Sequence, residues 1–516
     1  MQHKMSLLAV TMIFLFLNIQ INAQENDTLS AGIPEKEGVS SEGILNFLNA
    51  AENSNTEFHS FIMLRHGKIV AEGWWNPYAP DLKHTMYSCS KSFTATAIGF
   101  AVSEKLLSVN DKVITFFRNE IPDTVSSLLS GLTIKDVLSM SDGQEPDPTF
   151  PVVSRDSNWV RSFLAVPIVH QPGSKFLYNS LGTYMLSAII QKVTGQKLID
   201  YLTPRLFVPL GIREMDWEVD PLGINVGGWG LRIKTEDMAK FGQLFLQKGK
   251  WNGKQILPES WVTDASTVKI VQHPAYSQAQ RDSSDWEQGY CYQMWRCRNN
   301  AFRADGAYGQ YIIVMPDQDA VIAITAETPD MQEEINLVWK YLLPAIHQGE
   351  LPVNKSATDR LSNKLAMLSL PLPAKANSKL PGNMAGKVYL FEPNNRKLES
   401  MSFKFGIDRC DVTLKVDTVI HQLAFGEGNW HKSATTKRGP SLVAGARASF
   451  VGLPPFKIAA AYTWKDERNL VLTLRYIESP HTETITCHFD GNDIAVEIES
   501  SLEYGTKKSV LKGRSE

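Results

Sequence analysis

The chain has 516 residues, of which 43% are hydrophobic and 21% are charged, and its formal net charge at pH 7 is -3. This length predicts two or three domains, and the composition is typical of a globular protein with a sizeable core. A charge balance so close to zero gives no support to nucleic-acid binding, which usually shows as a basic surplus or stripe. Five cysteines are too few for a disulfide framework in a chain this long, and the status of Cys410 and Cys487 stays open.

The first 23 residues have the features of a secretory signal peptide. A short positive region, Met1–Lys4, precedes an uncharged run over 5–21, and Ile21-Asn22-Ala23 offers a cleavage site before Gln24. An uncleaved membrane anchor is the alternative, because the uncharged run approaches the length that spans a bilayer. We expect a periplasmic or secreted bacterial protein whose mature chain has no transmembrane domain.

The mature chain is predicted to open with a helix and a pair of strands. An amphipathic helix is expected over 41–53, and strands over 58–64 and 68–75 flank a turn. Further helices are predicted to start at Ser88, at Thr133 and just after Tyr178.

Strands return before the end of this first domain, which we place at 24–347. They are expected over 290–297, 308–315 and 320–326, and a helix over 331–347 closes the unit. The order of strands, helices and strands predicts an α/β (α+β) fold, an antiparallel sheet flanked by helices with a helical subdomain, rather than repeated βαβ units.

Two more regions follow. Residues 348–383 are rich in Pro, Lys, Ser and Leu and are predicted to be a linker. Alternating apolar residues beyond it predict an all-β domain over 384–516. Its aromatic residues either line a ligand cleft or form the core, and alternating aromatics on strands are more often core; they include Trp430, Phe456, Tyr462, Trp464 and Tyr476.

The stretch Ser88-Cys89-Ser90-Lys91 places a hydroxyl and an amine three residues apart. On a helix the two side chains share a face, and the apolar and small residues that follow predict burial. Burial lowers the pKa of a lysine, and a neutral lysine can take the proton of a nearby serine and turn it into a nucleophile. The backbone N–H of Ser88, at the helix start, would be available to an oxyanion.

The pattern Ser-x-x-Lys occurs twice more, at Ser266–Lys269 and Ser509–Lys512, and neither copy precedes a long apolar helix. The chain has no Gly-x-Ser-x-Gly, no His-Glu-x-x-His and no phosphate-binding glycine loop. Those absences count against the usual α/β hydrolases, zinc proteases and nucleotide enzymes, so the Ser88 copy is the strongest catalytic candidate.

Three motifs occur in a known order and spacing: Ser88-Cys89-Ser90-Lys91, Tyr178-Asn179-Ser180 and Asp305-Gly306-Ala307. With them, residues 30–347 resemble the penicillin-recognising serine hydrolases. This group contains class C β-lactamases, D-aminopeptidases, serine esterases and 6-aminohexanoate-dimer hydrolases. The resemblance implies a β-lactamase-like fold for the first domain.

The resemblance also implies a role for each motif residue. Ser88 would be the nucleophile, Lys91 its proton acceptor, and Tyr178 a second base that later protonates the leaving group. Whether Lys91 or Tyr178 is the general base stays open at this stage. Gly306 would lie on the strand that lines the cleft, and the N–H groups of Ala307 and Ser88 would form the oxyanion hole.

Two motifs depart from the pattern of the family. The second motif usually ends in Asn, but here Ser180 holds that position and Asn179 precedes it; a serine hydroxyl can still relay a proton between the lysine and the substrate. The third motif usually opens with Lys or His, but here it opens with Ala304, followed by Asp305. Ala304 cannot hold the carboxylate of a β-lactam and Asp305 would repel it. Arg303 points to the opposite face of the strand from Ala304.

We therefore expect an exported serine hydrolase that forms an acyl-enzyme at Ser88 and releases it with water. Its substrate would be an ester or amide of a small molecule or peptide, and no metal or organic cofactor is expected. A D-amino-acid-specific peptidase and a β-lactamase or penicillin-binding activity are the alternatives among enzymes. A non-catalytic periplasmic binding protein is the alternative of another class, and the intact Ser88, Lys91 and Tyr178 argue against it.

Overall fold

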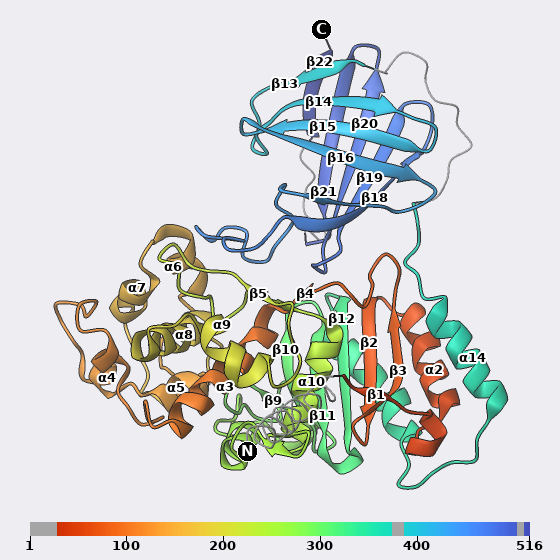
Figure 1. Cartoon of the computed structure of the whole chain (residues 1–516). Helices are drawn as coiled ribbons and strands as arrows, with labels where there is room; N and C mark the ends of the chain where they lie inside the picture. Colours follow the sequence, from red (N-terminus) through yellow and green to blue (C-terminus); the bar gives the residue numbers. More distant parts are fainter. Residues whose placement is uncertain (1–27, 374–385, 503–509, 516) are drawn as a thin grey trace, which may run out of the picture.

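A computed structural model describes residues 28–373, 386–502 and 510–515. The predicted signal peptide, residues 1–23, lies outside the described residues, and so does Ser509. Two bodies make up the described chain: a mixed body of helices and sheet, and a β-barrel above it in the view of Figure 1. No helix in the described ranges is both long and apolar enough to cross a membrane.

The mixed body is built on a seven-stranded sheet in the order β1-β3-β2-β12-β11-β10-β9. Every neighbouring pair is antiparallel except β1 on β3. Because β2 pairs with β12, the two ends of this domain close one sheet. The strands are β1 Ser30–Ala31, β2 Glu57–Arg65, β3 Lys68–Trp74, β9 Trp295–Arg296, β10 Phe302–Gly306, β11 Gln310–Met315 and β12 Ala320–Glu327.

Both faces of this sheet are covered, so its strands are buried almost throughout. Val321 and Ala323 of β12 join the core beside α3 and α10, whereas Ile322 and Ile324 join the core on the α2 side, as the alternation of a strand requires. The covering helices are α3 Ser90–Ser103 and α10 Thr235–Leu246 on one face, and α2 Ser41–Glu52, α13 Met331–Leu337, η6 Val338–Leu342 and η7 Leu343–Ala345 on the other.

A helical subdomain lies beside the sheet, at the left in Figure 1. Its central helix, α8 Ser180–Thr194, is buried over most of its length and contacts α3, α5 and α7. The antiparallel sheet with flanking helices, the helical subdomain and the all-β C-terminal domain confirm the predicted fold class. Other helices between β3 and β9 are η3 Val113–Phe116, α4 Ser127–Gly131, α5 Ile134–Leu138, α6 Thr149–Arg155, α7 Trp159–Ala165, α9 Leu198–Leu202, η4 Thr203–Phe207, α11 Glu259–Ser266 and α12 Gln278–Asp282.

Short elements complete this part of the chain. Strands β4 His84–Thr85, β6 Leu231–Ile233 and β5 Asp216–Trp217 form a small sheet, and β7 Lys250–Trp251 and β8 Lys254–Gln255 form a hairpin. The short turn η1 Pro34–Glu37 lies near the start of the described chain, η2 Tyr87–Cys89 directly precedes α3, and η5 Pro316–Gln318 joins β11 to β12.

The C-terminal domain is a closed barrel. Its strands follow one another antiparallel from β13 round to β22, and a parallel pairing of β16 with β18 closes the ring while β17 stays outside it. Closure removes the free sheet edges that would otherwise pair with other chains. The strands are β13 Val388–Phe391, β14 Leu398–Phe405, β15 Arg409–Val416, β16 Val419–Glu427, β17 His431–Thr435, β18 Phe456–Trp464, β19 Asn469–Tyr476, β20 Thr482–Asp490, β21 Asp493–Ser500 and β22 Val510–Ser515.

Two sequence expectations need correction. The predicted linker over 348–383 contains a helix, α14 Lys355–Ala366, which packs on α2 and buries Leu361. The predicted strand over 290–297 is reduced to β9, because Gln293 adopts a left-handed backbone conformation (φ 59°) and the chain turns there. The linker was predicted from composition, which does not register the amphipathic pattern of α14. The strand was predicted from residue type, and a residue with a left-handed backbone conformation interrupts an extended strand.

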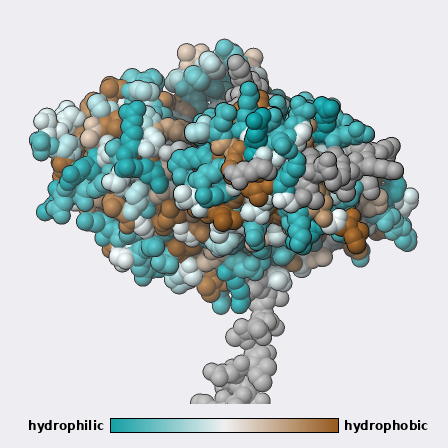
Figure 2. Space-filling model, turned by 90° about the horizontal axis from the view of Figure 1, so that it is seen from above, coloured by the Kyte–Doolittle hydropathy of each residue, from teal (hydrophilic) through white to brown (hydrophobic). Residues whose placement is uncertain are grey.

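The barrel docks on the mixed body through loops at one of its ends. The backbone N–H of Thr85 donates to Glu478 O at 2.9 Å, and that of Val219 donates to Val451 O at 3.1 Å. Val443 and Ala446, in the loop between β17 and β18, join the core around α3. Seen from above, brown hydrophobic residues lie scattered among hydrophilic ones on the visible face (Figure 2).

Candidate active site

Ser88 lies in the single turn η2, directly ahead of α3. It is partly exposed, whereas the neighbouring Cys89 is fully buried and contacts Gln310 O through its Sγ atom. Tyr87 has a φ of 44°, a left-handed conformation that a non-glycine residue rarely adopts. The nucleophile candidate therefore sits on a tight, strained turn at the start of a buried helix.

Lys91 is one turn further along and is only 1% exposed. Its Nζ lies 3.0 Å from Ser88 Oγ, 3.0 Å from Ser180 Oγ and 2.6 Å from Gly228 O. Burial lowers the pKa of Lys91 to about 7, although the carboxylates of Asp147 and Asp305 oppose the shift. Near neutral pH a large share of Lys91 is thus unprotonated and within reach of the Ser88 hydroxyl.

Tyr178 forms a hydrogen bond with Ser88. Burial raises the pKa of Tyr178 well above its ordinary value, and the nearby Asp305 carboxylate adds to this effect. The Lys91 Nζ atom lies 4.8 Å from the centre of the tyrosine ring. In the free protein Tyr178 is therefore a neutral hydroxyl, poised to donate a proton.

The second motif places its two polar residues on different sides of the chain. Ser180, the first residue of α8, turns its hydroxyl to Lys91. Asn179 is buried and instead caps α8, with Oδ1 accepting from Gly182 N at 3.0 Å and Nδ2 donating to Asp142 and Gln144. Ser180 thus joins the hydrogen-bond network around Lys91, and Asn179 caps the helix that carries Ser180.

The third motif lies on the edge of the sheet against the catalytic turn. A Cβ atom on Gly306 would fall 2.1 Å from Met86 O, so only glycine lets β10 approach the backbone two residues before Ser88. Ala307 follows directly at the end of β10. The third motif thus packs against the Ser88 turn at Gly306, and the role of the Ala307 N–H in the oxyanion hole stays a prediction.

Arg303 and Asp305 share one face of β10 and pair with each other. Their ion pair measures 2.9 Å and both side chains are buried, so the guanidinium charge is compensated within the strand. Burial raises the pKa of Asp305, and Arg303 offsets part of that shift. Ala304 points to the other face, into the core around α3. No cation of the strand β10 is left to receive a substrate carboxylate.

Two contributors to the site escaped the sequence prediction. The carbonyl of Gly228 accepts a hydrogen bond from Lys91, and a Cβ on that glycine would lie 2.5 Å from Ser180 O. The doublet Gly227-Gly228 therefore serves close backbone approach rather than flexibility. The second contributor is an aromatic wall, in which Trp295 stacks on Tyr178 at 5.8 Å between ring centres and Tyr290 packs edge-on. Only the tertiary fold assembles it.

Tyr87 connects the catalytic turn to the barrel. Its hydroxyl lies 2.5 Å from Nε2 of His481, whose Nδ1 lies 2.6 Å from Glu327 at the end of β12. His481 is fully buried, and Leu442 N donates to the same hydroxyl at 3.3 Å. Groups from the C-terminal domain thus hold the residue that precedes Ser88.

The second Ser-x-x-Lys copy shows no such arrangement. Ser266 Oγ donates to Val262 O within α11, and Lys269 pairs with Asp264. Ser266 and Lys269 thus have other partners, and no hydrogen bond like that between Lys91 and Ser88 joins them in the described structure. All five cysteines lie in the described residues and none forms a disulfide, so Cys410 and Cys487 are both free thiols.

The chain was compared with known protein families and structures. The Beta-lactamase family model matches residues 59–343, more than half of the chain. A 6-aminohexanoate-dimer hydrolase from Paenarthrobacter ureafaciens is 24% identical over 291 residues, which are 52% of this chain and 73% of the relative. A provisionally named D-alanyl-D-alanine carboxypeptidase from Escherichia coli O157:H7 is 24% identical over 39% of this chain and 54% of its own length.

Among solved structures, a provisionally named 6-aminohexanoate-dimer hydrolase from Bacillus anthracis superposes with a TM-score of 0.51 at 24% identity. The match covers 64% of this chain and 89% of that one, and it shows a shared fold. The family match covers the Ser88 turn, Tyr178 and β10 together. The chain belongs to the beta-lactamase family, the penicillin-recognising serine hydrolases.

Proposed function

We propose that the protein is a serine hydrolase that cleaves an ester or amide through an acyl-enzyme at Ser88. The observation that carries this proposal is the pair Ser88–Lys91: a buried lysine with a pKa of about 7, 3.0 Å from a partly exposed serine hydroxyl. A general base works best when its pKa lies near the working pH, and geometry and pKa agree here.

The pKa values favour Lys91 over Tyr178 as the base. Neutral Lys91 takes the Ser88 proton as Oγ forms a bond to the substrate carbonyl carbon. The resulting oxyanion is held by the N–H groups of Ser88 and Ala307. As the bond to the leaving group breaks, Tyr178 donates its proton to that group and recovers one from Lys91. Water then attacks the acyl carbon by the reverse proton path and regenerates Ser88.

A β-lactam is the less favoured substrate. Ala304 has no charge, and Arg303 is paired with Asp305, so β10 offers no cation to a substrate carboxylate. Asp305 is in turn paired with Arg303, so the pair presents no net positive charge to a substrate carboxylate. The remaining alternatives are a D-amino-acid-specific peptidase and a non-catalytic binding protein, and the intact Ser88 network speaks against the second.

The relatives leave the choice between ester and amide to experiment. The name of the Paenarthrobacter protein describes hydrolysis of a 6-aminohexanoate dimer, and that of the Escherichia coli protein describes removal of a terminal D-alanine. Both names describe cleavage of an amide in a small or peptide-like molecule. This supports an amide as a candidate substrate beside an ester.

Hydrolysis of p-nitrophenyl butyrate, nitrocefin and D-alanine p-nitroanilide by the wild type and by Ser88→Ala tests the proposal. We expect turnover of the ester or the anilide that Ser88→Ala loses, little or no turnover of nitrocefin, and labelling of Ser88 by a fluorophosphonate. Rapid nitrocefin hydrolysis would overturn the argument from Ala304. Failure of both turnover and labelling in the folded wild type would favour a binding protein.

Export to the periplasm or medium is also a proposal, and it rests on the first 23 residues. Expression in a bacterium followed by cell fractionation and N-terminal sequencing tests it. We expect a mature chain that begins at Gln24. A chain that keeps Met1 and sediments with membranes would support the uncleaved anchor.

A further inference from the structure

Gln310, the first residue of β11, is fully buried and takes no part in the proton transfers proposed above. Its Nε2 atom donates to the carbonyl of Ala307 at 3.1 Å and to that of Ala326, on β12, at 2.8 Å. Both partners are acceptors, so the orientation of the amide is fixed, and Oε1 has no hydrogen-bond partner in the described structure. The amide thus fastens the turn after β10 to a neighbouring strand of the sheet.

The turn between β10 and β11 depends on such support. It consists of Ala307, Tyr308 and Gly309, because Gly306 pairs in register with Gln310. Tyr308 has a φ of 67°, a left-handed conformation that persists only where the surroundings enforce it. The N–H of Gly309 donates to Gly306 O at 3.3 Å, and the trans peptide bond turns the N–H of Ala307 away from that carbonyl. The direction of the Ala307 N–H therefore follows from how this turn is held.

A second contact joins Gln310 to the Ser88 turn. The thiol of Cys89, the residue after Ser88, donates to the main-chain O of Gln310 at 3.1 Å. The Gln310 side chain also packs on Gly306, where a Cβ atom would lie 3.1 Å from its Cβ and 3.2 Å from its Cγ. One residue therefore contacts both segments that carry the predicted oxyanion donors, the N–H groups of Ser88 and Ala307.

We propose that Gln310 is a positioning residue of the oxyanion hole, which fixes the N–H of Ala307 relative to that of Ser88. This inference rests on the proposed hydrolysis at Ser88 and adds to it a residue that touches no substrate. Donors stabilise an oxyanion only when they already point at the place where its charge develops, and a small misplacement costs rate. Without the Nε2 donor the carbonyl of Ala307 loses its partner, and the turn relaxes together with its N–H.

Gln310→Met tests the proposal, because methionine is unbranched, similar in size and has no N–H donor in its side chain. With the substrate found in the panel, kcat should fall about tenfold and KM should change less than about twofold, since the donor acts on charge that forms only in the transition state. Gln243→Met is the matched control. Gln243, on α10, is also buried, but its side chain has no hydrogen-bond partner in the described structure, so kcat should stay unchanged.

A tetrahedral inhibitor separates positioning from a merely structural role. A trifluoromethyl ketone adds to Ser88 Oγ and places an oxyanion in the hole, so its inhibition constant should rise about tenfold in Gln310→Met. An unchanged inhibition constant or an unchanged kcat in the folded variant would overturn the proposal. If Gln310→Met fails to fold by circular dichroism, Gln310→Asn serves with the same expectations, because its amide is one methylene shorter and falls short of both carbonyls.

The wild type keeps this inference apart from the proposed function. Turnover or labelling of the wild type, together with a folded Gln310→Met that matches it in every readout, would leave the hydrolase intact and show the role of Gln310 to be wrong. Where no panel substrate is turned over, the rate of labelling of Ser88 by the fluorophosphonate replaces kcat. A folded wild type with neither turnover nor labelling would contradict the proposed function, and this inference with it.

Discussion

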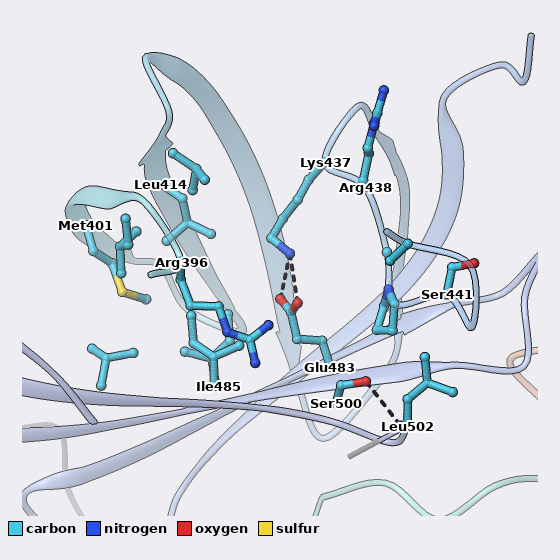
Figure 3. A pocket seen from close by; sticks show the side chains of 17 residues that line it. Arg396, Met401, Leu414, Lys437, Arg438, Ser441, Glu483, Ile485, Ser500 and Leu502 are labelled. Atoms are coloured by element: carbon cyan, nitrogen blue, oxygen red, sulfur yellow. Dashed lines mark hydrogen bonds and ion pairs between the residues drawn. The ribbon is translucent and has the colours of Figure 1, made fainter. Parts of the chain in front are cut away.

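Lys91 in the catalytic body and Lys437 in the barrel are both largely buried, yet their pKa values shift in opposite directions. Burial lowers the pKa of Lys91 to about 7, and its close partners are hydroxyls and a carbonyl. Burial alone would lower the pKa of Lys437 as well, but the carboxylate of Glu483, with which Lys437 pairs (Figure 3), outweighs it and raises the pKa. A buried lysine becomes a base only where no carboxylate pairs with it.

The largest expected effect separates the two lysines by activity. Lys91→Met should lower kcat/KM for the substrate found in the panel by about 10³-fold, since general-base catalysis contributes about 10²–10⁴-fold. Lys437→Met should change it less than about threefold, because that lysine lies outside the site. Steady-state kinetics on both purified variants measures the contrast. Equal losses in both variants would mean that the Lys437–Glu483 pair of the barrel also contributes to catalysis.

The pH dependence of kcat/KM in the wild type tests the lowered pKa of Lys91, which distinguishes it from Lys437. Because only neutral Lys91 accepts the Ser88 proton, kcat/KM should fall about tenfold per pH unit below pH 7 and level off above it. A profile of kcat/KM from pH 5 to pH 9 checks this. A midpoint near pH 10 instead would indicate that Tyr178 or an unshifted lysine limits the rate.

A smaller effect on activity is expected where the barrel touches the catalytic turn. His481→Gln removes the ring that joins Tyr87 to Glu327, so the strained turn loses support and kcat should fall about tenfold with KM little changed. His488→Gln, at an exposed position of β20, is the matched control. Full activity in a folded His481→Gln protein would show that Tyr87 needs no partner from the barrel.

The smallest effects concern stability, and they should have opposite signs. Lys437→Met leaves Glu483 without its partner and should lower the free energy of unfolding by about 2 kcal/mol. Lys91→Met should raise it at pH 7 by about 1 kcal/mol, because relief of the desolvated amine outweighs the unpaired carbonyl of Gly228. Urea denaturation at pH 7 measures both.

The gain in Lys91→Met should shrink as the pH rises. Between pH 7 and the ordinary lysine pKa of about 10.4, the unfolded chain binds more protons at this position than the folded one, so the stability of the wild type increases with pH. Repeating the denaturation at pH 9 checks the sign. A gain that grew with pH would contradict the lowered pKa.

Local pattern predicted much of the fold. The apolar runs of β2, β3 and β12 and the periodicity of α2 and α8 are properties of neighbouring residues, which short windows of sequence record. The strand predicted over 290–297 is interrupted at Gln293, which has a left-handed backbone conformation. Its side-chain amide donates hydrogen bonds to the carbonyls of Val137 and Leu138, and a short window of sequence does not record contacts with such distant residues. The helix α14 was hidden because its few apolar residues pack on α2, which is more than 300 residues earlier.

By itself the sequence determined the order of strands and helices and the spacing of Ser88, Lys91 and Tyr178, because backbone preference and helix periodicity act between near neighbours. Only the tertiary structure decided that Ser180 and not Asn179 turns toward Lys91, that Gly228 offers its carbonyl, and that Arg303 is consumed by Asp305. It also decided that aliphatic residues, and not the aromatic ones, line the barrel cavity of about 450 Å³ (Figure 3). These features depend on contacts between residues far apart in the chain. Such contacts decide which groups are buried beside which charges, and so which pKa values shift, and they decide where the interior is filled.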